Sequence, residues 1–170
     1  MIISQALKYV FEDIKIPFED NELSVNYHYG DQKELLLWTK DKGNDRKYPL
    51  IWYVLNKFTE FNDIYEVEAR LVLMAHTKYE KLNNWRSINT YQTILKPLTD
   101  EVKKSLLENP YISVISKNTK DKFIIKDEPL FGDNSGRTEK TSNKESVSID
   151  IVDARIITFR MRINANCIIK

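Results

Sequence analysis

The sequence predicts an α+β fold in which a mixed or mainly antiparallel sheet is flanked by two or three helices. Alternating apolar and polar residues mark several strands, of which DIYEVEARLVLMAHT (63–77) is the clearest. Apolar residues at three- and four-residue spacing mark helices at 2–13 and at 83–108. The chain has only 4 glycines and 5 prolines in 170 residues, which favours long regular elements with few tight turns.

The N-terminal region of the chain contains two expected helices and one expected strand. The first helix covers 2–13 and ends before Pro17. In ELSVNYHY (22–29) apolar and aromatic residues alternate with polar ones, which predicts a strand with one solvated face. DQKELLLWTK (31–40) predicts a short helix that begins at its first residue, and GNDRK (43–47) predicts a turn.

The least polar segment of the chain is YPLIWYVL (48–55). The residue before a proline avoids the helical region, so Tyr48 is expected to be extended. The remainder is short and rich in β-branched and aromatic side chains, which predicts a strand buried on both faces. We therefore expect this segment to lie mainly in the core.

The strand expected at 63–77 changes character along its length. Near its start, the apolar residues take one face, while the other face carries Glu66, Glu68 and Arg70. From Val72 onward both faces are apolar. The charged face is either solvated, with Glu68 and Arg70 paired as neighbours, or it meets a complementary charged face on another subunit.

The helix expected at 83–108 begins with a cap at Asn83 or Asn84. Pro97 must kink this helix or divide it in two, and Thr99, followed by two acidic residues, predicts a fresh start after the break. The sequence Asn109-Pro110 ends the helix.

The C-terminal region contains expected strands and one long loop. YISVIS (111–116), KFIIKD (122–127) and the alternating residues 157–163 predict strands. Between them, GDNSGRTEKTSNKES (132–146) has no large apolar residue and predicts a flexible loop inserted between strands. We see no domain boundary, so the whole chain, 1–170, is expected to form one domain.

The composition excludes several classes of protein. The 26 basic and 25 acidic residues leave a net charge of +1, which provides no broad field for nucleic acid or an anionic membrane. The single cysteine, Cys167, allows no internal disulfide. The N-terminus has no basic lead before its apolar residues, and the longest uncharged run is far shorter than the roughly 20 residues of a membrane span. We therefore expect a soluble protein.

Catalytic patterns are absent from the sequence. It contains no glycine-rich phosphate loop and no nucleophile elbow, and His28 and His76 belong to no spaced metal motif. We therefore expect no enzyme activity, no catalytic residue, no metal and no cofactor. The alternative is a metal-dependent nuclease, in which Asp63, Glu66 and Glu68 would gather with Asp150 and Asp153 around a cation.

Aromatic residues beside basic ones could stack on nucleic-acid bases, as in Trp85-Arg86 and in Tyr9 and Phe11 beside Lys8. At these spacings the aromatic residues more often belong to the core and their charged neighbours to the solvated surface. We therefore expect no base-stacking surface.

Three segments together resemble a known family: KYPLIWYVL (47–55), NNWRSINTYQTILKPLTDEVKKSL (83–106) and DIVDARIITFRMRI (150–163). They resemble tailed-phage neck proteins of the tail-terminator or tail-completion (head–tail connector) type. In that family a Tyr-Pro strand is followed by an acidic strand and by a helix with a W…R…Y…L.P pattern. The resembling positions in this chain are Trp85, Arg86, Tyr91, Leu95 and Pro97, with Asp153 and Ile156 leading the closing strand. The loop at 132–146 departs from the compact family pattern.

The resemblance implies a structural role in the virion. Such proteins are made in the host cytoplasm and assemble as homo-oligomeric rings, six-fold or twelve-fold, in the neck or tail. They dock onto portal, connector or tail proteins around a channel through which the genomic DNA passes. None of the resembling residues has a chemical role.

This role suggests two groups of candidate residues. Subunit-interface candidates are Tyr48, Trp52, Glu66, Glu68 and Arg70. Candidates for contact with the channel or a neighbouring ring are Arg137, Lys140 and Lys144 in the loop at 132–146. Two other functions stay open: an adaptor or assembly chaperone that is absent from the virion, and the nuclease described above.

Overall fold

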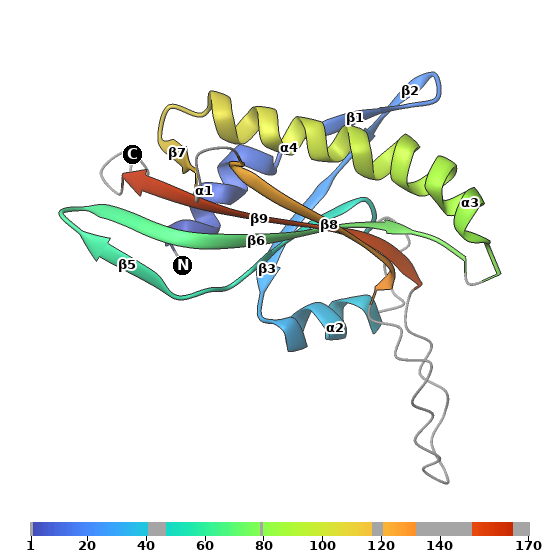
Figure 1. The fold of residues 1–170 in the computed structure, drawn as a ribbon, viewed down its shortest axis with the longest axis horizontal. Coiled ribbons are helices and arrows are strands. Elements are labelled where there is room, and N and C mark those ends of the chain that lie inside the picture. Colours follow the sequence, from blue (N-terminus) through green and yellow to red (C-terminus); the bar gives the residue numbers. More distant parts are fainter. Residues whose placement is uncertain (1, 41–46, 79, 117–120, 132–150, 165–170) are drawn as a thin grey trace, which may run out of the picture.

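The computed structural model describes residues 2–40, 47–78, 80–116, 121–131 and 151–164. A mixed sheet forms the centre of the fold, with helices on both faces, and this confirms the expected α+β class (Figure 1). Its central path is β3 (Asn26–Gly30), β4 (Leu50–Val54), β6 (Ile64–His76), β9 (Val152–Asn164) and β7 (Ile112–Ile115). The strands β5 (Phe58–Phe61) and β8 (Phe123–Phe131) pair with β6 and β9.

The two longest strands, β6 and β9, form an antiparallel ribbon through the middle of the sheet. Each has 13 residues, and they pair without a break from Ile64 opposite Asn164 to His76 opposite Val152. The outer edge of β6 is shared by β5 and β4, and the outer edge of β9 is shared by β7 and β8. Because β3 and β4 run parallel while the neighbouring pairs are antiparallel, the sheet is mixed.

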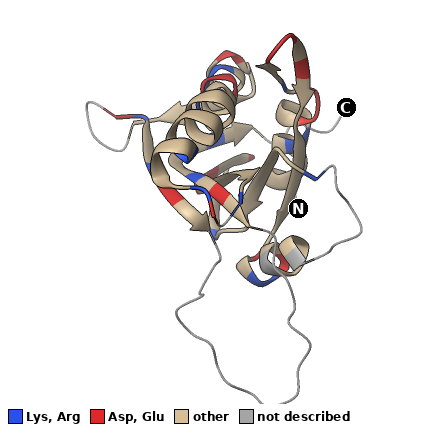
Figure 2. Ribbon diagram, turned by 90° about the vertical axis from the view of Figure 1, so that its right-hand side faces the viewer, with Lys and Arg blue, Asp and Glu red and all other residues tan. Residues whose placement is uncertain are grey.

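The two faces of the sheet are covered differently. On the first face, α1 (Ile2–Phe11) and a long helical segment enclose the main core, together with the small hairpin of β1 (Lys15–Phe18) and β2 (Asn21–Ser24). On the second face, α2 (Gln32–Lys40) covers a smaller apolar cluster. Figure 2, turned by 90°, shows the long helical segment and α2 on opposite sides of the strands.

Most of the expected elements are present. The helices at the N-terminus and at α2, the buried strand β4, the long strand β6 and the strands β7, β8 and β9 are confirmed. The helix α2 begins with a capping box, in which Asp31 Oδ1 accepts the Glu34 N–H at 2.8 Å and Glu34 Oε2 accepts the Asp31 N–H at 2.7 Å.

The prediction of one strand over 22–29 is wrong. The chain pairs first within the β1–β2 hairpin, and then enters the main sheet as β3 beside β4. Val25 lies between the two strands and donates its N–H to the Ile14 carbonyl. The alternation of apolar residues continues through this change of sheet, so periodicity alone could not locate the break.

The long helical segment is continuous, and two details predicted for it are wrong. It consists of α3 (Asn83–Arg86), the π-helix η1 (Ser87–Leu95) and α4 (Lys96–Glu108), so Thr99 is not a new start. Pro97 cannot donate to a carbonyl four residues back, and the preceding turns are wide, with the Lys96 N–H bonded to the Tyr91 carbonyl. The N-cap position is Leu82, not Asn83 or Asn84.

Several expectations fall on residues that the structure does not describe. These are the loop at 132–146 with Arg137, Lys140 and Lys144, the turn at 43–46, Asp150 and Cys167. Among the described helices, none has the length and apolar character that crossing a membrane requires.

Candidate functional site

The second face of the sheet has two halves, both crossed by β6 and β9. The covered half lies under α2 and consists of apolar side chains: Leu50, Trp52, Val72, Met74, Val152, Ala154 and Ile156. The open half lies beyond α2, toward the β5–β6 hairpin, and consists of Ile64, Glu66, Glu68, Thr158, Arg160 and Arg162. Arg70, partly buried, lies on the same face between the two halves.

The open half carries a ladder of opposite charges across the two strands. The strand pairing places Glu66 opposite Arg162 and Glu68 opposite Arg160. Glu66 Oε2 accepts a hydrogen bond from Arg162 Nε at 2.9 Å, and its Oε1 lies 3.0 Å from Arg160 Nε. The hydrogen bond from Arg162 lowers the pKa of Glu66. The basic partners of Glu66 thus belong to β9, the neighbouring strand of the same chain.

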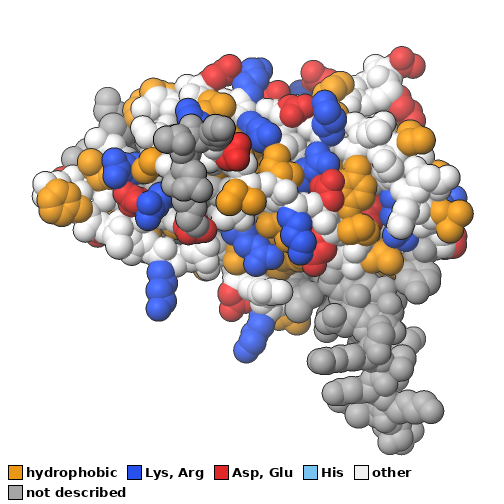
Figure 3. Space-filling model, in the orientation of Figure 1, with side chains coloured by type: hydrophobic (Ala, Val, Ile, Leu, Met, Phe, Trp, Pro, Cys, Tyr) orange, Lys and Arg blue, Asp and Glu red, His pale blue; other side chains and the backbone are white. Residues whose placement is uncertain are grey.

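Beside this ladder, the β5–β6 hairpin exposes apolar side chains. Phe61 is 75% exposed and Ile64 is also exposed on this face, while Phe58 is exposed on the first face, opposite Val67. An open hollow beside them is lined by Thr59, Phe61, Ile64, Glu66 and Arg162. Figure 3 shows hydrophobic side chains at this end of the molecule, with Lys and Arg side chains close by. The open half thus combines exposed apolar surface with charges that are already paired.

The covered half contains three neighbouring aromatic rings, those of His28, Trp38 and Trp52. The rings of His28 and Trp38 are 3.9 Å apart, and Trp52 lies 6.2 Å from Trp38. Trp52 Nε1 donates to the Gly30 carbonyl at 3.3 Å. Burial lowers the pKa of His28, because the protonated ring would lose its hydration.

The two aromatic interface candidates differ in exposure. Trp52 is 3% exposed, so its side chain belongs to the core of this chain. Tyr48 is half-buried at the margin of the covered half, with its ring 6.3 Å from that of His76 and 5.7 Å from Lys47 Nζ. Of the two, Tyr48 alone keeps a fraction of its surface exposed.

Polar contacts join the long helical segment to β9. Arg86 is buried, and its Nε lies 3.9 Å from Oδ1 of the buried Asp153. Leu130 donates its backbone N–H to the same oxygen at 3.1 Å. The Tyr91 hydroxyl donates to the Ala154 carbonyl at 3.5 Å, and burial raises its pKa. The expected roles of Trp85 and Arg86 are therefore reversed, because the arginine is buried and the tryptophan is exposed.

The acidic residues of the nuclease alternative do not converge. Glu66 and Glu68 lie on the second face, whereas Asp153 pairs across the strands with Ala75 of the first face and contacts Arg86. Within the described ranges, no group of three or more His, Cys, Asp and Glu side chains could hold a metal ion. Asp150 lies outside those ranges.

Sequence reasoning missed the residues that complete the open half. Arg160 and Arg162 were visible as the polar positions of an alternating strand, but only the strand register reveals Glu66 as their partner. Sequence reasoning also did not predict β5, the strand that carries the exposed Phe61. Comparisons with protein-family models and with curated proteins find no match for this chain.

Proposed function

We propose that this chain is a structural subunit of a phage virion neck ring, acting as a tail terminator or head–tail connector. Copies of the chain assemble around the DNA channel, six-fold or twelve-fold, and join the portal or connector to the tail. The protein is made in the host cytoplasm and then resides in the neck or tail of the virion.

The observation that carries the proposal is the exposed apolar surface beside the open half of the sheet. Phe61 and Ile64 are exposed on the second face at one end of the central ribbon, where no described helix covers them. Exposed apolar groups that lie together on a protein surface mark a contact with another molecule. Glu66 already forms ion pairs with Arg160 and Arg162 of the same chain. We therefore expect this surface to bind a partner through its apolar side chains.

The three segments that resemble the neck proteins also meet in space. The segment 47–55 supplies β4, whose Leu50 and Trp52 share an apolar cluster with Val152 and Ala154 of the segment 150–163. The segments 83–106 and 150–163 are joined by the Arg86–Asp153 contact and by the hydrogen bond from Tyr91 to Ala154. Residues of the three segments, far apart in the sequence, thus contact one another in the folded chain.

The test is the mass of the purified protein, measured by light scattering after size exclusion over a concentration series. A six- or twelve-fold species, formed alone or on mixing with portal or tail-tube proteins, is the expected result. A monomer or dimer under all these conditions contradicts the proposal. Such a protein, absent from purified virions, would instead be an adaptor or assembly chaperone.

A further inference from the structure

We propose that neighbouring copies of the chain contact one another head to tail, with the β5–β6 hairpin of one copy bound to the α3 end of the next. This inference rests on the ring assembly proposed above and assigns its subunit interface. It is carried by two exposed patches, which differ in charge and lie at opposite ends of the molecule.

The first patch, called the hairpin patch, consists of Phe61, Ile64 and the acidic residue Asp63. All of these side chains are exposed. Asn62 and Asp63 both have positive φ, 48° and 60°, and they connect the paired residues Phe61 and Ile64 as a two-residue turn. The patch therefore sits on a tight turn of fixed geometry.

The second patch, called the helix patch, consists of Leu82, Trp85 and Ile88, which recur every three residues at the start of the long helical segment. Leu82 is 73% exposed, and Trp85 and Ile88 are exposed as well. Lys78 and Lys81 flank these side chains, together with Glu80, and Lys81 Nζ lies 5.0 Å from the centre of the Trp85 ring. This patch is apolar with a basic margin.

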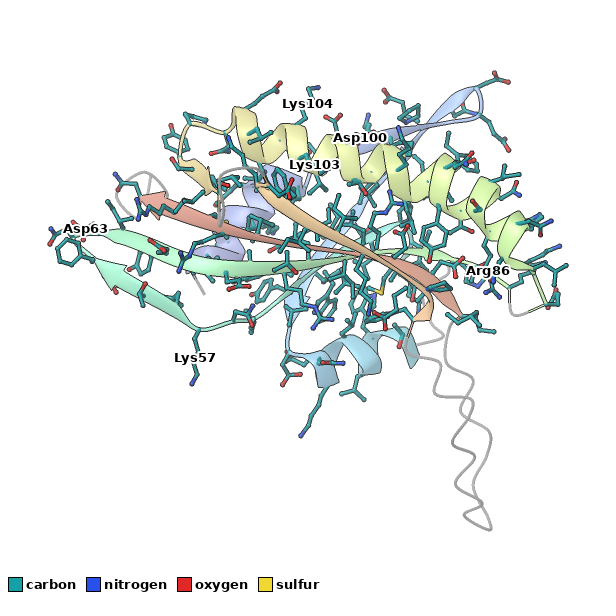
Figure 4. All side chains as sticks on the ribbon, in the orientation of Figure 1. Lys57, Asp63, Arg86, Asp100, Lys103 and Lys104 are labelled. Carbon is teal, nitrogen blue, oxygen red and sulfur yellow. The ribbon has the colours of Figure 1, made fainter. Side chains whose placement is uncertain are left out.

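The two patches cannot meet within one molecule. Strand β6 begins in the hairpin patch at Ile64 and ends at His76, shortly before the helix patch. Its 13 residues separate the patches by about 40 Å, at roughly 3.3 Å per residue. Figure 4 shows this separation, with Asp63 at one end of the long axis and Arg86 at the other. A contact between the patches therefore requires a second copy.

The two patches differ in charge, and one of them adjoins a hollow. The open hollow beside the hairpin, lined by Phe61, Ile64 and Glu66 among others, can receive an apolar side chain of the helix patch. Trp85 is the natural occupant, since tryptophan and arginine dominate the contact energy of many interfaces. The lysine above its ring would then lie near Asp63 of the neighbouring copy, which strengthens the correct pairing and opposes like-to-like contacts.

This geometry leads to rings and not to closed dimers. A contact between two different patches leaves one patch of each kind free in every dimer, so further copies are added until the ring closes. A contact of the hairpin patch with itself would satisfy both copies at once and would end at the dimer.

The experiment uses two variants of the full chain, Phe61→Glu and Leu82→Glu, each of which places a charge in one patch. Both positions are about three quarters exposed, so the fold should be retained, and this is checked by the thermal midpoint. We expect each variant alone to be monomeric under conditions in which the wild type forms rings. Mixed in equal amounts, they should form dimers and nothing larger, because each pair retains one intact interface.

A matched control is Leu37→Glu, on the outer side of α2, where a leucine is also exposed but lies in neither patch. This variant should still form rings. A second check uses the charge reversals Asp63→Lys and Lys81→Glu. Each substitution alone should weaken assembly, and the double variant, in which the opposite charges are exchanged, should assemble again.

The outcomes separate this inference from the proposed function. If the wild type forms rings and either glutamate variant also does, the head-to-tail contact is wrong while the neck-ring function stands. If only Phe61→Glu abolishes assembly, the hairpins contact each other and the inference is also wrong. A wild-type protein that never assembles, even with portal and tail-tube proteins, overturns the proposed function and this inference with it.

Discussion

The covered and open halves of the second sheet face are built from the same two strands and have opposite chemistry. In the covered half, β6 and β9 contribute Val72, Met74, Ala154 and other apolar side chains to a cluster under α2. In the open half the same strands contribute a ladder of glutamates and arginines. One short helix, α2, thus divides this face into a region that stabilises the fold and a region that is available for contact.

The change between the halves occurs within a few residues of β6. Up to Arg70 its side chains alternate between the apolar first face and the charged second face. From Leu71 to Ala75 every side chain is buried. A strand that is covered on both sides has no solvated position, so its polar alternation stops where α2 begins to cover it.

The largest effect is expected from shortening an aromatic side chain of the covered half. Trp52→Ala should lower the free energy of unfolding by about 3–5 kcal/mol, because it leaves a cavity under α2. The matched variant Phe61→Ala in the exposed hairpin should change it by less than about 0.5 kcal/mol. Urea denaturation followed by circular dichroism measures both, and equal losses would contradict the division of the face.

A smaller loss of unfolding free energy is expected from Gly30→Ala, a substitution that tests how closely α2 and β4 approach each other. An added Cβ would lie 2.8 Å from Cζ2 of the buried Trp52 ring and closer still to Oε2 of Glu34 in the capping box, so both side chains would have to shift. Overpacking of this kind typically costs about 1–3 kcal/mol of unfolding free energy, because the ring must move. An unchanged denaturation midpoint would show that the rings of the covered half can shift freely. Ser24→Ala, at an exposed position before β3, serves as the control.

The next largest loss of unfolding free energy is expected from removing the capping box at the start of α2. Asp31→Ala removes one half of the capping box with Glu34 and should cost about 1 kcal/mol of unfolding free energy. Lys33→Ala, on the exposed first turn of the same helix, should leave the stability nearly unchanged. If both variants behave alike in urea denaturation, the capping box does not contribute to holding α2 on the sheet.

The covered half should also respond to pH through His28. Its pKa in the folded state lies below the ordinary value of 6.5, so the unfolded chain binds the proton more readily. The free energy of unfolding should therefore decrease as the pH falls below about 6.5, toward the lower folded pKa. His28→Gln should remove this dependence, as measured by denaturation at a series of pH values. A wild-type stability that is flat between pH 7 and the acid transition would contradict it.

The smallest effect is expected from the charge ladder of the open half. The pKa of Glu66 lies below its ordinary value of 4.5, since Arg162 stabilises the ionised form, so its contribution is present above pH 4.5 and is lost as the pH falls further. Glu66→Gln should change the unfolding midpoint little at neutral pH, because exposed ion pairs are worth little. A large decrease in the unfolding midpoint would show that the charge ladder contributes substantially to the stability of the sheet. In high salt, the wild type should have nearly the same unfolding midpoint as the Glu66→Gln variant.

Local pattern in the sequence was sufficient for much of the fold. The helices, the strand β4 and the alternation of β6 follow from residue spacing, because each repeats over a length that one element occupies. The loss of alternation from Val72 onward also predicted burial on both faces. The break between β2 and β3 had no such signal, because the same alternation continues through Val25.

The sequence by itself therefore determined most of the helical and extended segments, although not β1, β5 or the break between β2 and β3, because these patterns depend on the spacing of neighbouring residues. The tertiary structure alone decided the rest of the candidate site. It paired Glu66 with Arg162, 96 residues away on the chain, and buried Arg86 against Asp153. It also left Phe61 exposed beside the start of β6 and Leu82 exposed after its end. The physical reason is that strand register and the position of α2 arise from contacts between distant segments, which no local spacing encodes.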